Sequence, residues 1–193
     1  MPELADRPEA WPVEDSGYPY DGDGWVVKVR RDQVRRPGHP REPAFSRVVV
    51  EHPGAAVVLA VDDRDRVLCL WQYRHAVARN LVQLPAGLCD VDGEDAAEVA
   101  RRELVEEAGF EADRWTHLAS AYSSPGFTAE QGHYFLAEGL REVGRGDFRP
   151  EHEEAEMVVG WVPFAELHEA VVAGRLADAH LALAVLLTGA RRH

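Results

Sequence analysis

The feature that most restricts the fold of this chain is a glutamate-rich segment, residues 94–108, that has the pattern of an amphipathic helix. Gly109 follows it directly, and glycine is typical of a helix C-cap because it adopts positive φ without strain. A helix with one apolar face requires a sheet or further helices to pack against. The residues that form this face at helical spacing are Ala97, Ala100, Leu104 and Ala108.

Three carboxylates lie beside the apolar face. Glu103, Glu106 and Glu107 are three and four residues apart, so they share one side of the helix. Like charges at this spacing destabilise an isolated helix by roughly 0.2–0.5 kcal/mol per pair, so the cluster indicates a bound cation. Carboxylate oxygens are hard ligands that favour Mg²⁺ or Mn²⁺. The alternative is a solvated helix whose glutamates form ion pairs with Arg101 and Arg102.

The spacing of these residues resembles the Nudix box, G-x5-E-x7-R-E-U-x-E-E-x-G-U, in which U is a bulky apolar residue. The one departure is the leading glycine, since six residues rather than five separate Gly87 from Glu94. This difference affects the loop before the helix and leaves the carboxylate positions intact. On this motif the chain is identified as a member of the Nudix hydrolase superfamily; the matching positions are Glu94, Arg102, Glu103, Leu104, Glu106, Glu107, Gly109 and Phe110.

The resemblance implies an α/β (α+β) fold, the Nudix α/β/α sandwich with a mixed sheet, and an N-terminal antiparallel strand segment before it. We expect residues 1–45 to form an N-terminal arm with dimerisation strands and residues 46–193 to form the Nudix hydrolase domain. We expect a homodimer whose N-terminal strands complete the partner's substrate site, because Trp25, Val27 and Val29 need an apolar surface to pack on. The resemblance allows such a dimer, and the alternative is that these strands pack on the chain's own sandwich.

Short apolar runs and breaker clusters predict the elements of the chain. The first 23 residues contain four prolines and are expected to be a tail or arm that orders only against something else. Helices are expected at 94–108, 164–173 and 178–188, the last with Leu181, Ala184, Val185 and Leu187 on its core side. Strands are expected at 25–34, 45–51, 55–61, 66–73, 81–84, 115–122, 133–138 and 157–162.

In the Nudix superfamily a water attacks phosphorus of a nucleoside diphosphate that is linked to another group. The resemblance implies that Glu103, Glu107 and the backbone carbonyl of Ala86 hold the divalent metal, with Glu106 as a further ligand or base. Arg102 is grouped with the catalytic residues, but its expected role is structural: pairing with Glu94 or a neighbouring glutamate fixes the helix and its loop. The metal also bridges the charge between an acidic protein and an anionic substrate.

The region around the box resembles the ADP-ribose pyrophosphatases of the superfamily. Pro125 lies fifteen residues after Phe110, the distance by which these enzymes are commonly told apart. The resemblance implies substrate contacts from Arg74 and Glu130, a catalytic glutamate in the acidic loop that holds Glu153 and Glu154, and Arg47 as a further substrate contact. Each feature has a plainer interpretation: Pro125 as a turn, the acidic run as solvated surface, and Arg47 as a structural residue.

The expected function is therefore metal-dependent hydrolysis of ADP-ribose to AMP and ribose 5-phosphate. One alternative is a hydrolase of another nucleoside diphosphate sugar or of a dinucleoside polyphosphate. An alternative of another class is a catalytically inactive Nudix-fold sensor that binds nucleotides. The box glutamates argue against such a sensor, because inactive modules typically lose them.

Charge and composition restrict the partners. With 21 basic and 34 acidic side chains the formal charge is −13, which argues against binding of nucleic acid or of an anionic membrane. The longest apolar runs have about seven residues, too few to span a bilayer, and no secretory signal is visible. The two cysteines, Cys69 and Cys89, fit a reducing cytoplasm and have no neighbouring partner that would make either a nucleophile.

Overall fold

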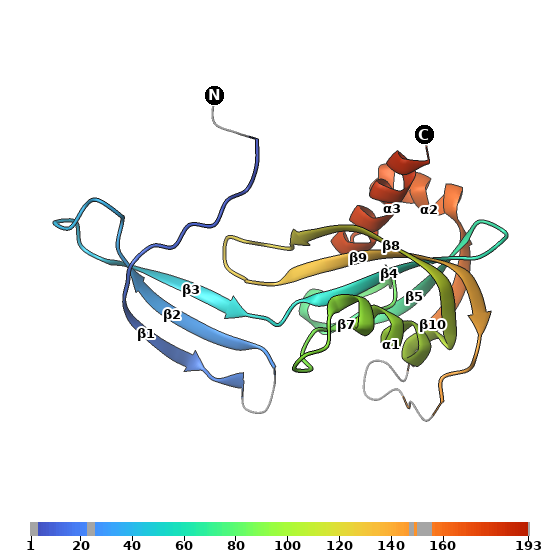
Figure 1. The fold of residues 1–193 in the computed structure, drawn as a ribbon, viewed down its shortest axis with the longest axis horizontal. Coiled ribbons are helices and arrows are strands. Elements are labelled where there is room, and N and C mark those ends of the chain that lie inside the picture. The colour runs from blue at the N-terminus through green and yellow to red at the C-terminus, as the bar shows by residue number, and fades with distance from the viewer. Residues whose placement is uncertain (1–3, 23–25, 147–148, 150–155, 193) are drawn as a thin grey trace. The chain divides into compact units, whose positions relative to one another are not determined.

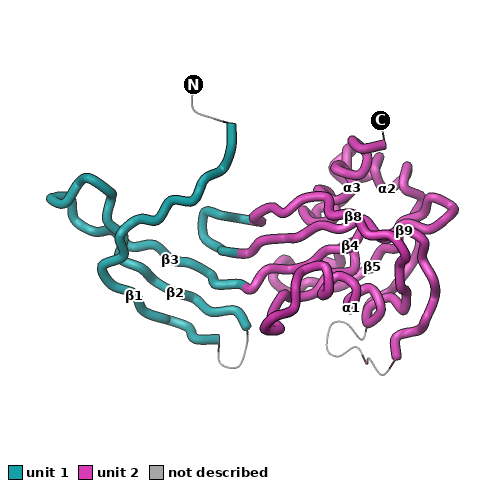
Figure 2. Tube along the Cα trace, viewed as in Figure 1, with its two compact units in different colours: residues 1–52, 124–129 teal, residues 53–123, 130–193 magenta. Residues whose placement is uncertain are grey.

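The computed structural model describes residues 4–22, 26–146, 149 and 156–192. The chain forms two compact units, shown in Figure 2. Unit 1 consists of residues 1–52 and 124–129, and unit 2 consists of residues 53–123 and 130–193. This division follows compactness alone, so the expected domain boundary after residue 45 stays a prediction.

Unit 1 is built on a three-stranded antiparallel sheet in the order β1-β2-β3 (Figure 1). The segment 124–129 belongs to this unit because the Phe127 carbonyl accepts a hydrogen bond of 2.7 Å from the Val50 amide. The strands are β1 (Val13–Tyr20), β2 (Lys28–Val34) and β3 (Phe45–Glu51).

Strand β1 was not expected, since the first 23 residues were expected to be a tail or arm that orders only against something else. Val13 pairs with Val34 and Tyr20 pairs with Val29 of the same chain, so β1 is an antiparallel partner of β2, with register shifts between Val13 and Asp15 and between Gly17 and Tyr20. All of its residues are exposed, which explains why no apolar alternation marked it in the sequence. Backbone pairing and polar contacts hold this strand, and one of these contacts is the hydrogen bond of 2.5 Å that Ser16 donates to Asp32.

Unit 2 contains a mixed seven-stranded sheet with the central order β10-β5-β4-β9-β8. Strands β4 and β9 are parallel, while the other pairs are antiparallel, with β6 paired to β5 and β7 paired to β4. The strands are β4 (Ala55–Val61), β5 (Arg66–Arg74), β6 (Arg79–Gln83), β7 (Ala86–Leu88), β8 (Phe110–Tyr122), β9 (Gln131–Glu142) and β10 (Val158–Pro163).

Helices cover both faces of this sheet (Figure 1). Helix α1 (Ala96–Ala108) packs on one face, in a core with Val58, Leu68 and Phe135. Helices α2 (Phe164–Val172) and α3 (Ala179–Arg191) pack on the other face around Leu59. A central strand that is covered on both sides explains the continuous apolar run of β4. The expected α/β/α sandwich with a mixed sheet is therefore confirmed.

The remaining differences from the sequence expectations concern the ends of elements and some short or weakly patterned elements. Helix α3 ends at Arg191 rather than at residue 188, and β2 begins at Lys28, whereas the expected first residue, Trp25, lies outside the described residues. Strand β7 and a 3₁₀ turn at His75–Val77 were not expected, since each has only three residues. Strands β8 and β9 are longer than expected because the residues at their ends are mostly half-buried or exposed and do not alternate between apolar and polar types. Among the described residues, no helix is long and apolar enough to cross a membrane.

Candidate metal and substrate site

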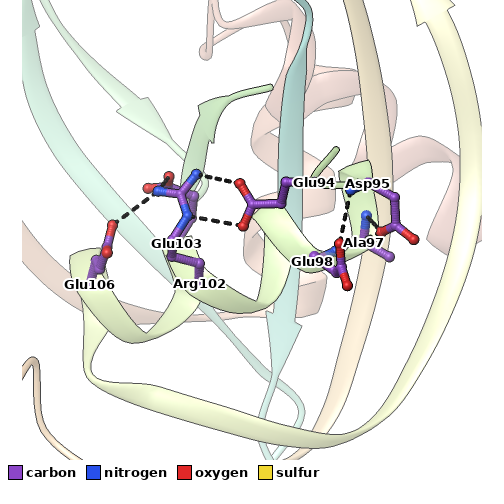
Figure 3. Close-up of polar contacts among 7 residues, drawn as sticks. All are labelled: Glu94, Asp95, Ala97, Glu98, Arg102, Glu103 and Glu106. Atoms are coloured by element: carbon purple, nitrogen blue, oxygen red, sulfur yellow. Dashed lines mark hydrogen bonds and ion pairs between the residues drawn. The ribbon is translucent and has the colours of Figure 1, made fainter. Parts of the chain in front are cut away.

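Helix α1 begins and ends at strong capping signals. The Asp95 side chain accepts hydrogen bonds of 2.9 Å from the amides of Ala97 and Glu98, and Glu98 accepts one of 3.0 Å from the Asp95 amide (Figure 3). This reciprocal arrangement is a capping box. Gly109 closes the helix at φ 77° and donates its amide hydrogen to the carbonyls of the last turn. The expected end at Ala108 is confirmed, and the start lies two residues after the expected Glu94.

The carboxylates of Glu103 and Glu107 are almost buried, with 9% and 7% of the residue exposed. The Ala86 amide of β7 donates a hydrogen bond of 2.8 Å to Glu107 Oε2. A Cβ atom added at Gly87 would lie 2.0 Å from Glu103 Cδ, so only a glycine lets the backbone of β7 pass this close. Both side chains were expected at the edge of the helix's buried face, and the structure places them against β7.

Arg102 connects the carboxylates of the box (Figure 3). Its Nε and Nη2 atoms each donate a hydrogen bond of 3.2 Å to Glu94. Its Nη1 atom donates to Glu103 Oε1 at 2.6 Å and to Glu106 Oε2 at 3.2 Å. The expected pairing of Arg102 with Glu94 is confirmed, and the same guanidinium extends it to two more glutamates. Hydrogen bonding to Glu94, together with the negative charges of all three, raises the pKa of Arg102.

The donor set fits a hard divalent cation. Within the described ranges no group of three His, Cys, Asp or Glu side chains is arranged to hold a metal by itself. Mg²⁺ does not require such a group, because it takes one or two carboxylates and completes its shell with water and substrate phosphate oxygens. Glu103 and Glu107 offer two such carboxylates on adjacent turns, next to the main chain of β7.

Arg74, the expected substrate contact, lies at the end of β5 in a chain of three polar side chains. Its Nε atom donates a hydrogen bond of 2.6 Å to Gln83 Oε1. Gln83 in turn donates from Nε2 to Asp178 Oδ2, also at 2.6 Å. Asp178 is the N-cap of α3, where its Oδ1 atom accepts the Leu181 amide at 2.8 Å.

Glu130, the other expected contact in unit 2, precedes β9. It accepts a hydrogen bond of 2.5 Å from Ser123 and lies 3.7 Å from His180 Nε2. The other ring nitrogen of His180 lies 2.7 Å from the Tyr134 hydroxyl. Burial raises the pKa of Tyr134 to about 12, helped by the negative charges of Glu130 and Asp178, so this hydroxyl keeps its proton at neutral pH.

The other expected site residues belong to unit 1 or fall outside the described residues. Arg47 and Pro125 belong to unit 1, where the Arg47 guanidinium stacks 4.3 Å from the centre of the Phe45 ring and Pro125 lies in a turn closed by Ser124 and Phe127. Glu153 and Glu154 fall outside the described residues. Unit 2 thus brings together the box residues Ala86, Glu103, Glu106, Glu107 and Arg102, and it holds Arg74 and Glu130 in two further polar networks.

Sequence reasoning missed the supporting residues Gln83, Asp178 and His180. Asp178 had a readable signal, since aspartate before an apolar helical run is a preferred N-cap. Gln83 had none, because its partner Asp178 is 95 residues away in sequence. Both cysteines are free thiols; burial raises the pKa of Cys69 to about 12, and burial together with the charge of Glu94 raises that of Cys89. Neither thiol is therefore activated as a nucleophile.

Comparisons with known proteins identify the family and the fold. A family model described as the NUDIX domain matches residues 50–182. The chain is 44% identical over 155 residues to the ADP-ribose pyrophosphatase of Mycobacterium tuberculosis, covering 80% of this chain and 72% of that protein. It is 40% identical over 115 residues to the ADP-ribose pyrophosphatase of Bacillus subtilis, covering 56% and 62%. A crystal structure of an ADP compounds hydrolase has the same fold, with a TM-score of 0.74, 18% identity and 95% of each chain covered.

Proposed function

This chain belongs to the Nudix domain family, and on that premise we propose that it hydrolyses the diphosphate linkage of ADP-ribose to AMP and ribose 5-phosphate. The observation that carries the substrate assignment is the similarity to the ADP-ribose pyrophosphatase of Mycobacterium tuberculosis over most of both chains. The box geometry supports the hydrolase reaction, because Arg102 connects Glu94, Glu103 and Glu106 in one network, and Glu107 accepts a hydrogen bond from the Ala86 amide beside them.

We propose Mg²⁺ or Mn²⁺ as the cofactor. Glu103, Glu107 and the carbonyl oxygen of Ala86 would hold it, with Glu106 as a further ligand. A bound divalent ion offsets the charge of the diphosphate and lowers the pKa of water. This contribution matters in a protein of net charge −13, which otherwise repels its substrate.

The side chains of the protein supply the remaining chemistry. Arg74 and Glu130 bind the substrate, and Arg47 and Pro125 of unit 1 are proposed as further contacts. Water forms a bond to phosphorus while the bridging phosphorus–oxygen bond breaks, and a carboxylate accepts the proton that the water loses. Glu153, Glu154 and Glu106 are the proposed acceptors. Arg102 orients the carboxylates of Glu103 and Glu106 through its hydrogen bonds to them.

We also propose a homodimer formed through the sheet of unit 1. The buried hydrophobic residues of the described chain all belong to unit 2, so this sheet lacks an apolar core of its own. Tyr20 pairs with Val29, and Val29 pairs with Val50, which places these side chains on one face together with Val48. Tyr20 and Val48 are 46% and 50% exposed. An apolar face of this kind fits a second copy of the chain, whose substrate site the N-terminal strands would complete.

The free thiols of Cys69 and Cys89 support a reducing compartment, and we propose the cytoplasm.

A panel of nucleoside diphosphate derivatives with Mg²⁺, separated by chromatography, tests the proposed function. We expect ADP-ribose to be turned over fastest, to yield AMP and ribose 5-phosphate, and to be left intact when EDTA is added. Faster turnover of another nucleoside diphosphate sugar or of a dinucleoside polyphosphate would replace the substrate assignment. Tight binding of ADP-ribose without turnover would instead identify the chain as a nucleotide sensor.

A further inference from the structure

Gln83 connects a surface arginine to the buried start of a helix. Its amide oxygen accepts the hydrogen bond from Arg74 Nε, and its amide nitrogen donates to Asp178. Only one orientation of the amide serves both partners, because the flipped amide would turn its NH₂ group toward the guanidinium and its oxygen toward the carboxylate. The two neighbours thus determine the orientation of Gln83, and Gln83 in turn determines where Arg74 Nε lies.

The far end of this chain of contacts is rigid. Asp178 is 8% exposed, and its second oxygen holds the Leu181 amide in the first turn of α3. Leu181, Ala184 and Val185 of the same helix have no exposed surface, so α3 is anchored in the core. The same turn carries His180, which lies beside Glu130. A single helical turn therefore lies beside Glu130 through His180 and reaches Arg74 through Gln83.

The other end of this chain of contacts, Arg74, is exposed, and without its contact with Gln83 its side chain would be mobile. Arg74 lies at the exposed end of β5, and a long arginine side chain loses rotamer freedom whenever it is held by a ligand. Its contact with Gln83 uses only Nε, so Nη1 and Nη2 have no partner within the part of the chain that the structure describes. These two nitrogens form the fork that matches a phosphate group.

We propose that Gln83 is a positioning residue for substrate binding, which transmits the fixed position of Asp178 to Arg74 and presents the Arg74 Nη edge to the diphosphate. The proposal rests on the proposed function, because it takes Arg74 as the phosphate contact. Gln83 itself touches no substrate. Its effect is to reduce the conformational entropy that Arg74 loses when substrate binds.

The first test is Gln83→Leu, which keeps the size of the side chain and removes both hydrogen bonds. We expect KM for ADP-ribose to rise about tenfold while kcat stays within about twofold, because an interaction that acts equally in the ground and transition states changes KM alone. Asn80→Ala is the matched control, since it removes an exposed amide from the same strand and leaves the Arg74 contact in place. An unchanged KM in Gln83→Leu overturns the proposal.

Asp178→Ser separates positioning from stability. Serine is a good N-cap, so α3 keeps its capping hydrogen bond, but the shorter side chain no longer reaches Gln83. We expect the same rise in KM as for Gln83→Leu, with the thermal midpoint close to that of the wild type. In Arg74→Ala, adding Gln83→Leu should raise KM no further, because the group that Gln83 positions is already gone. Two effects that multiply would show that Gln83 acts independently of Arg74 and would contradict the proposal.

A readout without substrate distinguishes this proposal from the proposed function. The Arg74 Nε–H signal, assigned in ¹⁵N NMR spectra by its loss in Arg74→Ala, should exchange slowly with water in the wild type and rapidly in Gln83→Leu and Asp178→Ser. The wild-type protein could show slow exchange, lost in both variants, and yet fail to hydrolyse ADP-ribose. That result would support the contact between Gln83 and Arg74 and would show that the proposed substrate is wrong. Rapid exchange in the wild type would reject the positioning role whatever the activity.

Discussion

At the scale of single residues, Gly87 explains why the loop before α1 accepts one residue more than the Nudix box. The structural requirement on this glycine is its close approach to Glu103, where a Cβ atom would lie 2.0 Å from the carboxyl carbon. That contact depends on where β7 lies against α1. The number of residues between Gly87 and Glu94 affects only the loop that joins them, so an insertion there leaves the carboxylates in position.

Gly87→Ala should therefore displace the Glu103 carboxylate. The clash is with the flexible end of a side chain, so we expect the fold to persist at an expense of about 1–3 kcal/mol in the free energy of unfolding. Turnover should fall by at least about tenfold, because a misplaced ligand weakens metal binding. Gly17→Ala is the control, since an added Cβ there meets no atom within 4 Å. Steady-state kinetics against Mg²⁺ concentration, with thermal unfolding, checks both parts; normal kinetics in Gly87→Ala would contradict the role of Glu103.

Glu107→Gln should abolish most turnover and leave the fold intact. The substitution removes the charge that a metal requires, while the amide oxygen of glutamine can still accept the hydrogen bond from the Ala86 amide. Glu98→Gln is the matched control in the same helix, because glutamine preserves the capping box. We expect a loss of roughly a hundredfold or more in kcat with an unchanged thermal midpoint. Near-normal Mg²⁺-dependent activity in Glu107→Gln would rule out its assignment as a metal ligand.

At the scale of elements, β1 and α1 are held by different forces. Helix α1 has caps at both ends and an apolar face in the core, so it is determined locally and by burial. Strand β1 is exposed along its length and depends on pairing with β2 and on the contact between Ser16 and Asp32. We therefore expect β1 to be sensitive to conditions that leave α1 unaffected.

Acid should loosen the pairing of β1 with β2. The hydrogen bond from Ser16, together with the charge and hydrogen bond of Arg30, lowers the pKa of Asp32 below its ordinary value of 3.8. A lowered pKa in the folded state means that the charged form stabilises the fold. This contribution is fully present above pH 3.8 and is lost as the pH falls through the lower pKa of the folded state.

An NMR titration of the Asp32 carboxyl carbon checks this prediction. Ser16→Ala should raise the pKa of Asp32 toward its ordinary value. In this variant, the protection of the β1 amides against hydrogen exchange should also depend less on pH in the acid range. Ser46→Ala, an exposed serine in β3 of the same sheet, should change neither. An Asp32 pKa that is the same in wild type and Ser16→Ala would show that this hydrogen bond does not stabilise the charged carboxylate.

At the scale of the whole molecule, the proposed homodimer requires that a second copy of the chain covers the apolar face of unit 1. We expect sedimentation equilibrium at micromolar concentration to give twice the chain mass of 21.5 kDa. Val48→Glu places a charge on this face and should shift the protein toward the monomer, since burying an unpaired charge opposes association. Val172→Glu is the control, because Val172 is 67% exposed at the end of α2. A wild-type species of 21.5 kDa would exclude the dimer and the shared substrate site.

The sequence by itself determined the elements whose signals are local. Helix α1, its end at Gly109 and the pairing of Arg102 with Glu94 follow from periodicity, capping chemistry and residues less than three helical turns apart. The buried strands β4 and β5 follow from two short apolar runs on either side of the turn residues 62–65, which is the pattern of a hairpin. The Nudix box predicted the fold, because its spacing specifies one helix together with the loop before it.

Only the tertiary structure decided the features that depend on distant parts of the chain. The contact between Gly87 and Glu103, the pairing of β1 with β2, and the link from Arg74 through Gln83 to Asp178 join segments whose own sequences carry no signal for one another. The physical reason is that a hydrogen bond or a close approach depends on position in space, whereas propensity and periodicity report only on neighbours along the chain. The sequence therefore determined which carboxylates gather on α1, and the folded chain decided which backbone and side chains hold them and the substrate arginine in place.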